Sequence, residues 1–165
     1  MPIGNHTGVN LLDAQIIYFL TRFIENARSL STDPIVVHTS WRDAYAYVTD
    51  SGAATLTEYG RQTAPFTLAG MRAVSVDILS AERLSKDSFL IRWTERSFEN
   101  GLRMSAEHFT GVFDVIFCRP ISPEALIANP LGLYIRAIDW SHKLGQRDQR
   151  ESDRSSRPKH RQSCA

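Results

Sequence analysis

The side chains of this chain that could carry out nucleophilic chemistry are a few histidines, two cysteines and scattered carboxylates. A nucleophile needs its general base within hydrogen-bond reach. His108 and Cys118 lie ten residues apart in one segment with strand character, and about 3.3 Å per residue places them about 33 Å apart. The same spacing separates His108 from Asp114 by about 20 Å. Neither pair is therefore predicted to form a catalytic dyad.

Metal and phosphate sites also lack their usual patterns. His38 lies in a segment with helical periodicity, but neither a histidine nor a cysteine at i+3 or i+4 can share a metal ion with it. Cys118 and Cys164 are too few for a zinc site or a disulfide framework. The nine glycines form no glycine-rich phosphate loop. We therefore predict that the chain binds no metal and needs no cofactor.

Two pairs of carboxylates keep an enzyme open as an alternative. Asp77 with Glu107, or Glu95 with Asp139, could meet in a pocket between a sheet and the helices that cover it. Charged side chains are rarely buried unless they are paired. We interpret all four as carboxylates on a solvated face of the sheet, and we predict that the chain is not an enzyme.

The distribution of charge argues against nucleic-acid binding. Residues 1–144 contain thirteen Lys or Arg and fifteen Asp or Glu, which gives this part a charge near −2. Residues 145–165 contain six basic and three acidic residues, with no aromatic side chain among them to stack on bases. We expect no direct contact with nucleic acid. Because this tail is almost devoid of apolar residues, we expect it to be disordered.

The spacing of apolar residues predicts a first helix after an irregular segment at residues 1–12. From Asp13, taken as the N-cap, apolar residues recur at helical spacing up to Leu30. Ile17 and Tyr18 lie off this stripe and are expected to be exposed. Four polar residues also lie away from the stripe, namely Arg22, Glu25, Asn26 and Arg28.

Two further helices are predicted before the strands begin. Asp33-Pro34 is typical of a helix start, with Asp as the N-cap and Pro at the first helical position. The apolar residues from Val37 to Val48 keep helical spacing, and Gly52 is expected to end this helix. A shorter third helix holds Leu56 and Tyr59 and stops near Gly60 or before Pro65.

At about residue 72 the apolar period changes to two, which predicts strands. Strands are expected near 72–78, 88–99 and 102–117, and a last strand runs to about Trp140. Ser122-Pro123-Glu124 is typical of a cap that opens one helical turn before this last strand.

Asn100-Gly101 predicts a hairpin with a two-residue loop. This loop would place Trp93 opposite His108 and Phe89 opposite Val112. One face would then collect an apolar set, namely Phe89, Ile91, Trp93, Met104, Ala106 and Val112. Gly111, inside the long strand, indicates a bulge or a sharp bend.

Together these elements predict an α+β domain over residues 13–144. Three N-terminal helices would pack on one face of a bent, four-stranded antiparallel sheet. The basic tail at 145–165 would follow it.

Three segments resemble TrbF-type conjugal transfer proteins, members of the wider VirB-type family of bacterial type IV secretion systems. They are FIENARSLSTDP (Phe23–Pro34), RWTERSFENG (Arg92–Gly101) and NPLGLYIRAIDWSHKL (Asn129–Leu144). The similarity keeps the same order and spacing through most of residues 13–144. The last segment is the most specific, because its NPLG turn resembles the Asn-Pro-x-Gly signature of that family.

The resemblance implies a fold, a location and a role. The fold would be a cone like that of nuclear transport factor two. The domain would lie in the periplasm, held to the inner membrane by one spanning helix. It would act as a scaffold or assembly subunit that contacts itself, as a homodimer, and other channel subunits. Six residues are our candidates for partner contacts: Asn129, Pro130, Leu131, Gly132, Ile17 and Tyr18.

Three alternatives remain open from the sequence. No run reaches the roughly 18 apolar residues of a spanning helix, so we expect the anchor upstream of Met1, although an anchorless variant is the other reading. An isomerase or hydrolase of the same cone fold would use a pocket carboxylate. A non-catalytic module for a small ligand or peptide is the third. A deep apolar pocket with convergent polar groups would favour the enzyme, and a shallow or filled one the scaffold.

Overall fold

The computed structural model of the chain describes residues 10–143. Four helices come first: α1 (Leu11–Arg28), α2 (Pro34–Tyr45), α3 (Asp50–Thr63) and the short α4 (Pro65–Leu68). The strands follow as β1 (Arg72–Arg83), β2 (Ser88–Glu99), β3 (Leu102–Phe117) and β4 (Leu133–Lys143), with α5 (Pro123–Ala128) between the last two.

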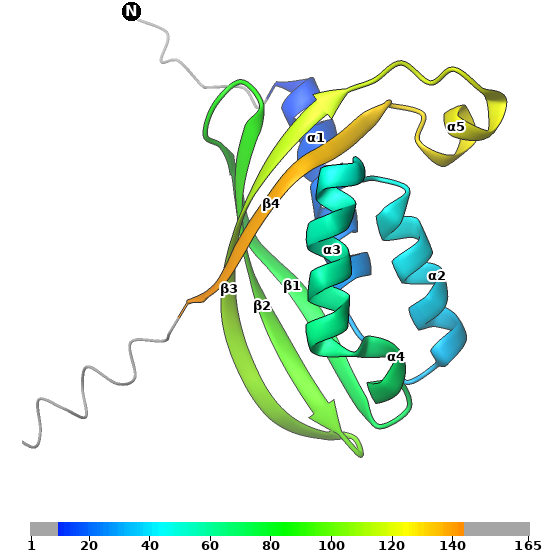
Figure 1. Cartoon of the computed structure of the whole chain (residues 1–165). Coiled ribbons are helices and arrows are strands. Elements are labelled where there is room, and N and C mark those ends of the chain that lie inside the picture. Colours follow the sequence, from blue (N-terminus) through cyan, green and yellow to red (C-terminus); the bar gives the residue numbers. More distant parts are fainter. Residues whose placement is uncertain (1–9, 144–165) are drawn as a thin grey trace, which may run out of the picture.

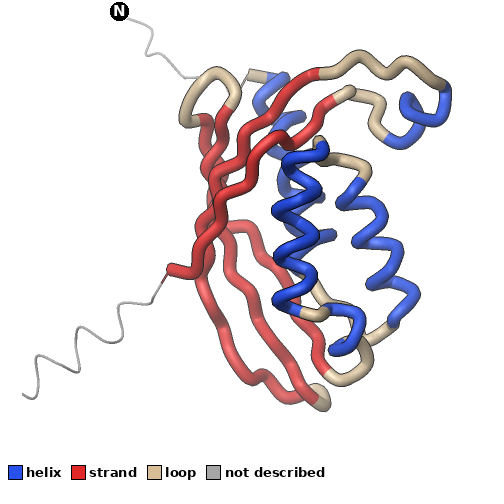
Figure 2. The backbone as a smooth tube through the Cα atoms, in the orientation of Figure 1, coloured by secondary structure: helices blue, strands red, loops and turns tan. Residues whose placement is uncertain are grey.

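The four strands form one antiparallel sheet in the order β1-β2-β3-β4. Figure 1 shows the sheet strongly bent, with α1 to α4 on one of its faces. Figure 2 shows the same separation of helices and strands into two layers. The predicted α+β fold is confirmed, including the order of three long helices before a four-stranded antiparallel meander.

The core lies between the apolar stripe of α1 and the concave face of the sheet. The stripe predicted from helical spacing is buried, as are the residues of β2 and β3 that face it. Its largest fully buried side chains are Trp93, Phe23, Phe89, Phe113, Ile16, Leu20, Ile24, Leu56, Ile91, Leu133 and Ile135.

The first helix starts earlier than predicted. Asn10, and not Asp13, is the N-cap, because its side chain accepts a hydrogen bond from the Leu12 amide at 3.1 Å. The predicted irregular segment 1–12 is therefore too long by Leu11 and Leu12, and residues 1–9 lie outside the described residues. Asp13 instead pairs with Arg83 at 2.5 Å, which joins the start of α1 to the end of β1.

The prediction that Gly52 ends the second helix is wrong. Asp33 caps α2 as expected, but α2 already ends at Tyr45, and Thr49 caps α3. Gly52 lies in the first turn of α3, where a β-carbon would come within 2.5 Å of the Ile135 carbonyl oxygen. A glycine selected for close approach to a strand therefore resembled a helix stop in the sequence.

The hairpin loop is confirmed, but its register is wrong by one residue. Asn100 and Gly101 form the two-residue loop, with φ of 50° and 78°. A bulge follows between Ser97 and Phe98. Beyond it Trp93 lies opposite Phe109, and Phe89 opposite Phe113. The buried face therefore gains Phe113 and Val115, whereas Met104 is exposed.

Gly111 has a different role from the predicted bulge. It pairs regularly with Ile91 on one side and Trp140 on the other. A β-carbon there would lie 2.7 Å from the Phe113 ring and 3.0 Å from the Trp93 ring. The glycine therefore makes room for two aromatic core side chains. The predicted disordered tail, 145–165, lies outside the described residues.

Candidate functional site

The Asn129-Pro130-Leu131-Gly132 turn directly precedes β4 and leads into it. The Gly132 amide donates to the Asn129 carbonyl oxygen at 3.0 Å, which closes the turn. The Asn129 side chain then holds the first residue of β4 twice: its Nδ2 donates to the Leu133 carbonyl at 2.6 Å, and its Oδ1 accepts from the Leu133 amide at 3.3 Å. The side-chain amide therefore acts in place of a neighbouring strand.

The four candidate residues of this turn fall into two groups. Asn129 is only 2% exposed, so it supports the turn from within and has no free surface. Gly132 has φ of 61°, and a β-carbon there would collide with the Cys118 carbonyl oxygen. Pro130 and Leu131 are exposed. Only these two present side chains that a partner can reach.

The two candidates on α1 also differ. Tyr18 is 68% exposed, as expected. Ile17 is half-buried and packs against the core, contrary to the expectation that it is exposed. The free surface on this part of α1 is therefore centred on Tyr18.

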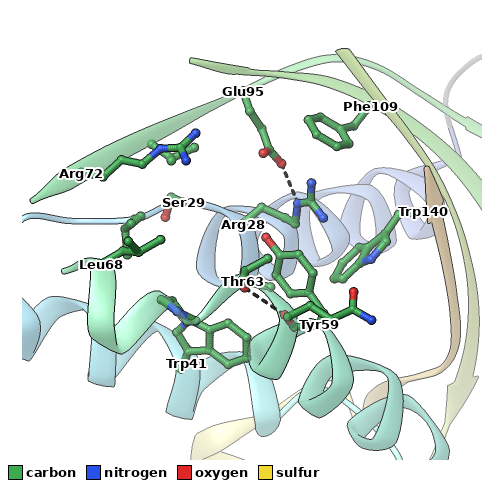
Figure 3. A pocket seen from close by; sticks show the side chains of 15 residues that line it. Arg28, Ser29, Trp41, Tyr59, Thr63, Leu68, Arg72, Glu95, Phe109 and Trp140 are labelled. Carbon is green, nitrogen blue, oxygen red and sulfur yellow. Dashed lines mark hydrogen bonds and ion pairs between the residues drawn. The ribbon is translucent and has the colours of Figure 1, made fainter. Parts of the chain in front are cut away.

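A cavity of about 570 Å³ lies between the concave face of the sheet and the helices. The walls are formed by the end of α1, by α2, α3 and α4, and by all four strands, and Figure 3 shows the side chains that line them. Aromatic and charged side chains share the lining: Arg28, Trp41, Tyr59, Arg72, Glu95, Phe109 and Trp140.

Arg28 and Glu95 form an ion pair inside this cavity. The Arg28 Nε donates to the Glu95 Oε1 at 2.6 Å, and the indole of Trp93 donates to the same oxygen at 2.8 Å. Arg28 is 7% exposed. Its guanidinium carbon lies 4.4 to 5.0 Å from three ring centres, those of Phe109, Tyr59 and Trp140. This arrangement combines a buried ion pair with cation–π contacts.

Two other donors in the cavity wall have no partner among the described residues. They are the indole Nε1 of Trp41 and the Nε of Arg72, and both atoms are buried. Buried donors are normally satisfied, so a group that brings an acceptor would be stabilised here. Burial raises the pKa of the Tyr59 phenol above its ordinary value, which is itself well above neutral pH, so this side chain is uncharged at pH 7.

The predicted carboxylate pairs do not form. Asp77 lies opposite Thr94, and Glu107 lies opposite Glu95. Because neighbouring residues of a strand point to opposite faces, Asp77 and Glu107 are on different faces of the sheet. The same ladder places Asp139 on the outer face and Glu95 on the inner one. The interpretation of solvated carboxylates is therefore wrong for Glu95 alone. Among residues 10–143, no group of three or more potential metal ligands comes together.

Comparison with known proteins decides the family. Residues 3–143 match the model of the VirB8 protein family. This match covers most of the chain. The chain belongs to the VirB8 family.

The relatives agree with this assignment. The chain is 28% identical over 128 residues to the conjugal transfer protein TrbF of Rhizobium radiobacter. The match covers 76% of this chain and 58% of that protein, so the chain spans little more than half the length of this relative. The VirB8-family resemblance to TrbF-type proteins inferred from three sequence segments is confirmed.

Solved structures show that the VirB8-family fold is shared at low sequence identity. The VirB8 protein of Agrobacterium tumefaciens superposes with a TM-score of 0.72 at 14% identity, covering 84% of this chain and 98% of that one. TraE in complex with 2-chloroisonicotinic acid gives a TM-score of 0.68 at 18% identity, covering 82% and 100% of the two chains. The expected cone like that of nuclear transport factor two is therefore confirmed.

The Arg28–Glu95 pair is the feature of this VirB8-family domain that sequence reasoning missed, although two signals point to it. The expectation that Arg28 lies away from the buried stripe is wrong, because Arg28 follows Ile24 by four residues and is in phase with that stripe. Glu95 follows Trp93 by two and is in phase with the buried face of β2. Two opposite charges, each on the apolar face of its own element, indicate a buried pair.

Proposed function

We propose that this chain is the periplasmic domain of a non-enzymatic scaffold subunit of a type IV secretion channel that serves conjugation. The observation that carries the proposal is the VirB8-family match over residues 3–143. The relative TrbF is named as a conjugal transfer protein. Among residues 10–143, no helix is long and apolar enough to cross a bilayer. In this proposal a spanning helix outside those residues anchors the domain in the bacterial inner membrane.

The state of Glu95 supports a scaffold rather than an enzyme. The Glu95 Oε1 accepts from Arg28 and Trp93, so this carboxylate joins the end of α1 to β2, which is a structural role. The surfaces proposed for partner contacts are the exposed part of the Asn129–Gly132 turn and the Tyr18 region of α1. The partners are other channel subunits and a second copy of the chain.

Transfer frequency in a deletion strain, complemented with variants, tests this role. Leu131→Asp should lower conjugal transfer, because it places a charge on the exposed side of the turn without removing a core contact. Asp77→Asn, Glu107→Gln and Asp139→Asn should leave transfer nearly unchanged. Immunoblots confirm equal protein levels. If a folded carboxylate variant abolishes transfer and Leu131→Asp does not, the enzyme alternative replaces the scaffold.

The location is tested separately with a reporter that is active only in the cytoplasm. When it is fused after Lys143 of the full-length protein, it should remain silent. Reporter activity would contradict the periplasmic location.

A second candidate function is the binding of a small carboxylate in the cavity. The unpartnered donors of Trp41 and Arg72 favour it, and TraE has been solved with 2-chloroisonicotinic acid. Titration of that acid into the 165-residue chain should shift the NMR signal of the Trp41 indole N–H. Arg72→Gln should weaken this effect, whereas Arg92→Gln, on the outer face of the sheet, should not. Shifts that remain unchanged in Arg72→Gln would exclude the cavity as the site.

A further inference from the structure

Three segments that are distant in the sequence meet at one end of the molecule. The pairing of Arg83 with Phe89 and of Ser88 with Asp114 places the β1–β2 loop beside the end of β3. The pairing of Phe117 with Leu133 places the β3–β4 connection, which contains α5, at the same end. The ion pair of Asp13 with Arg83 adds the start of α1. Figure 1 shows these segments together at the top of the view, with α5 projecting from the body.

This end, which we call the apical end, carries many exposed apolar side chains. Ile121 is 97% exposed and Ile127 is 84% exposed. The helix α5 buries none of its residues. The exposed apolar residues of the apical end are Leu11, Leu12, Leu84, Phe117, Ile121, Leu126, Ile127 and Leu131. A surface of this kind is normally covered by a partner or a membrane.

The composition of the apical end favours a lipid surface over a folded protein. All but one of its exposed apolar side chains are aliphatic, and they lie on loop tips and helix ends. Protein interfaces instead concentrate their binding energy in Trp, Tyr and Arg. Lys86 and Arg119 are exposed among them, together with Asp87 and Glu124. Because these two basic and two acidic side chains offset each other, the attraction of the apical end to a bilayer would be mainly apolar.

The point at which the chain enters the domain also favours a lipid surface. The described chain enters the domain through the start of α1, which lies at the apical end beside Arg83. If an anchor is joined upstream, as in the proposed function, it is attached to the domain at this end. Such an attachment also raises the local concentration of lipid around the apical end, so that weak contacts suffice.

We propose that the apical end rests on the membrane, with the side chains of Ile121, Leu126 and Ile127 inserted among the lipid chains. This inference rests on the proposed membrane-anchored location. It adds an orientation: α5 and the β1–β2 loop face the bilayer, and the β2–β3 hairpin faces away. The contact is of the monotopic kind, in which apolar side chains enter the interface between headgroups and acyl chains.

Site-specific fluorescence on vesicles tests the orientation. The exposed Cys118 thiol at the apical end is labelled with a polarity-sensitive dye in the otherwise complete 165-residue chain carrying Cys164→Ser. A polyhistidine tag before residue 1 tethers the chain to vesicles that contain nickel-chelating lipid and nitroxide-labelled lipid. The matched control carries the dye at Leu102→Cys with Cys118→Ser and Cys164→Ser. Leu102 is 71% exposed at the opposite, hairpin end.

Quenching and a blue shift of the Cys118 dye, but not of the dye at position 102, are expected, and they should persist at high salt. Ile121→Asp with Ile127→Asp should lower the vesicle partition constant of the untagged chain at least about tenfold. Ile35→Asp, an exposed apolar position on α2, should not change it.

Equal quenching at both positions would overturn the proposal. So would loss of self-association without lipid in the Ile121→Asp, Ile127→Asp variant, because a second copy would then be the occupant. Failure of the reporter test would reject the periplasmic location and leave this vesicle result unaffected.

Discussion

At the scale of single residues, Arg28 shows how this domain handles charge in its interior. The guanidinium lies among aromatic rings and donates to Glu95, which also accepts from Trp93. Removing one member of such a pair leaves the other buried and uncompensated. The pair therefore fixes the end of α1 against β2, and it engages the Oε1 of the carboxylate that faces the cavity.

A double-mutant cycle measures this coupling. Arg28→Met and Glu95→Gln should each lower the free energy of unfolding by about 3–5 kcal/mol, because each leaves a buried partner. The double variant should lose about 1–3 kcal/mol less than the sum of the single losses. Urea denaturation followed by tryptophan fluorescence gives the three values. Strict additivity would show that the two side chains do not stabilise each other.

We predict that the buried Tyr59 phenol makes the free energy of unfolding fall at alkaline pH. Burial raises its pKa in the folded domain, so the unfolded chain ionises first, near pH 10. The contribution of Tyr59 to stability is therefore complete below that pH and is lost as pH rises through the folded pKa. Wild type should lose unfolding free energy above pH 10 more steeply than Tyr59→Phe. Tyr18→Phe, at an exposed position, should keep the wild-type slope.

At the scale of elements, the types and order of helices and strands follow from the sequence, because apolar spacing reflects which face each element buries. Asn100-Gly101 fixes the hairpin loop by its positive φ angles. The bulge beside Phe98 leaves no comparable signal, since any residue can occupy it. The register of the long hairpin, and with it the burial of Phe113, could therefore be known only from the structure.

Glycines mark the limit of prediction within these elements. Gly52 and Gly111 serve as sites of close approach to Ile135 and to aromatic rings, and such contacts depend on residues that are distant in the sequence. Gly132 differs, because its turn chemistry is local. The Asn129–Gly132 turn was correctly expected, although the sequence did not show that Asn129 points inward.

The turn before β4 should be far more sensitive at Gly132 than at Pro130. Gly132→Ala should lower the free energy of unfolding by about 2–4 kcal/mol, because it combines positive φ with a collision against the Cys118 carbonyl. Pro130→Ala should cost at most about 1 kcal/mol, since it mainly frees the unfolded chain. Thermal unfolding of both variants is the measurement. Similar losses for the two would show that the turn relaxes around an added β-carbon.

At the scale of the whole molecule, the helices cover one face of the sheet and leave its edges open. β4 is an edge strand. Among the described residues, the only bridge on its outer side joins Ile135 to Val48. The stretch of β4 beyond Asp139 therefore presents unpaired backbone groups, which can accept another strand. The exposed Tyr18 on α1 offers a second, separate surface for a copy of the chain.

We predict that the 165-residue chain self-associates weakly, as a dimer with a micromolar dissociation constant, because no membrane is present to raise its local concentration. Tyr18→Arg is the sharper probe of the α1 surface, since Ile17→Arg would also disturb core packing. Sedimentation at concentrations well above the micromolar range should show dimer for wild type and for Ile35→Arg, an exposed apolar control on α2. Tyr18→Arg should shift the distribution to monomer.

If wild type remains monomeric, the dimer is excluded. If Tyr18→Arg remains dimeric, the α1 surface is excluded, and the open edge of β4 becomes the place where the two copies meet.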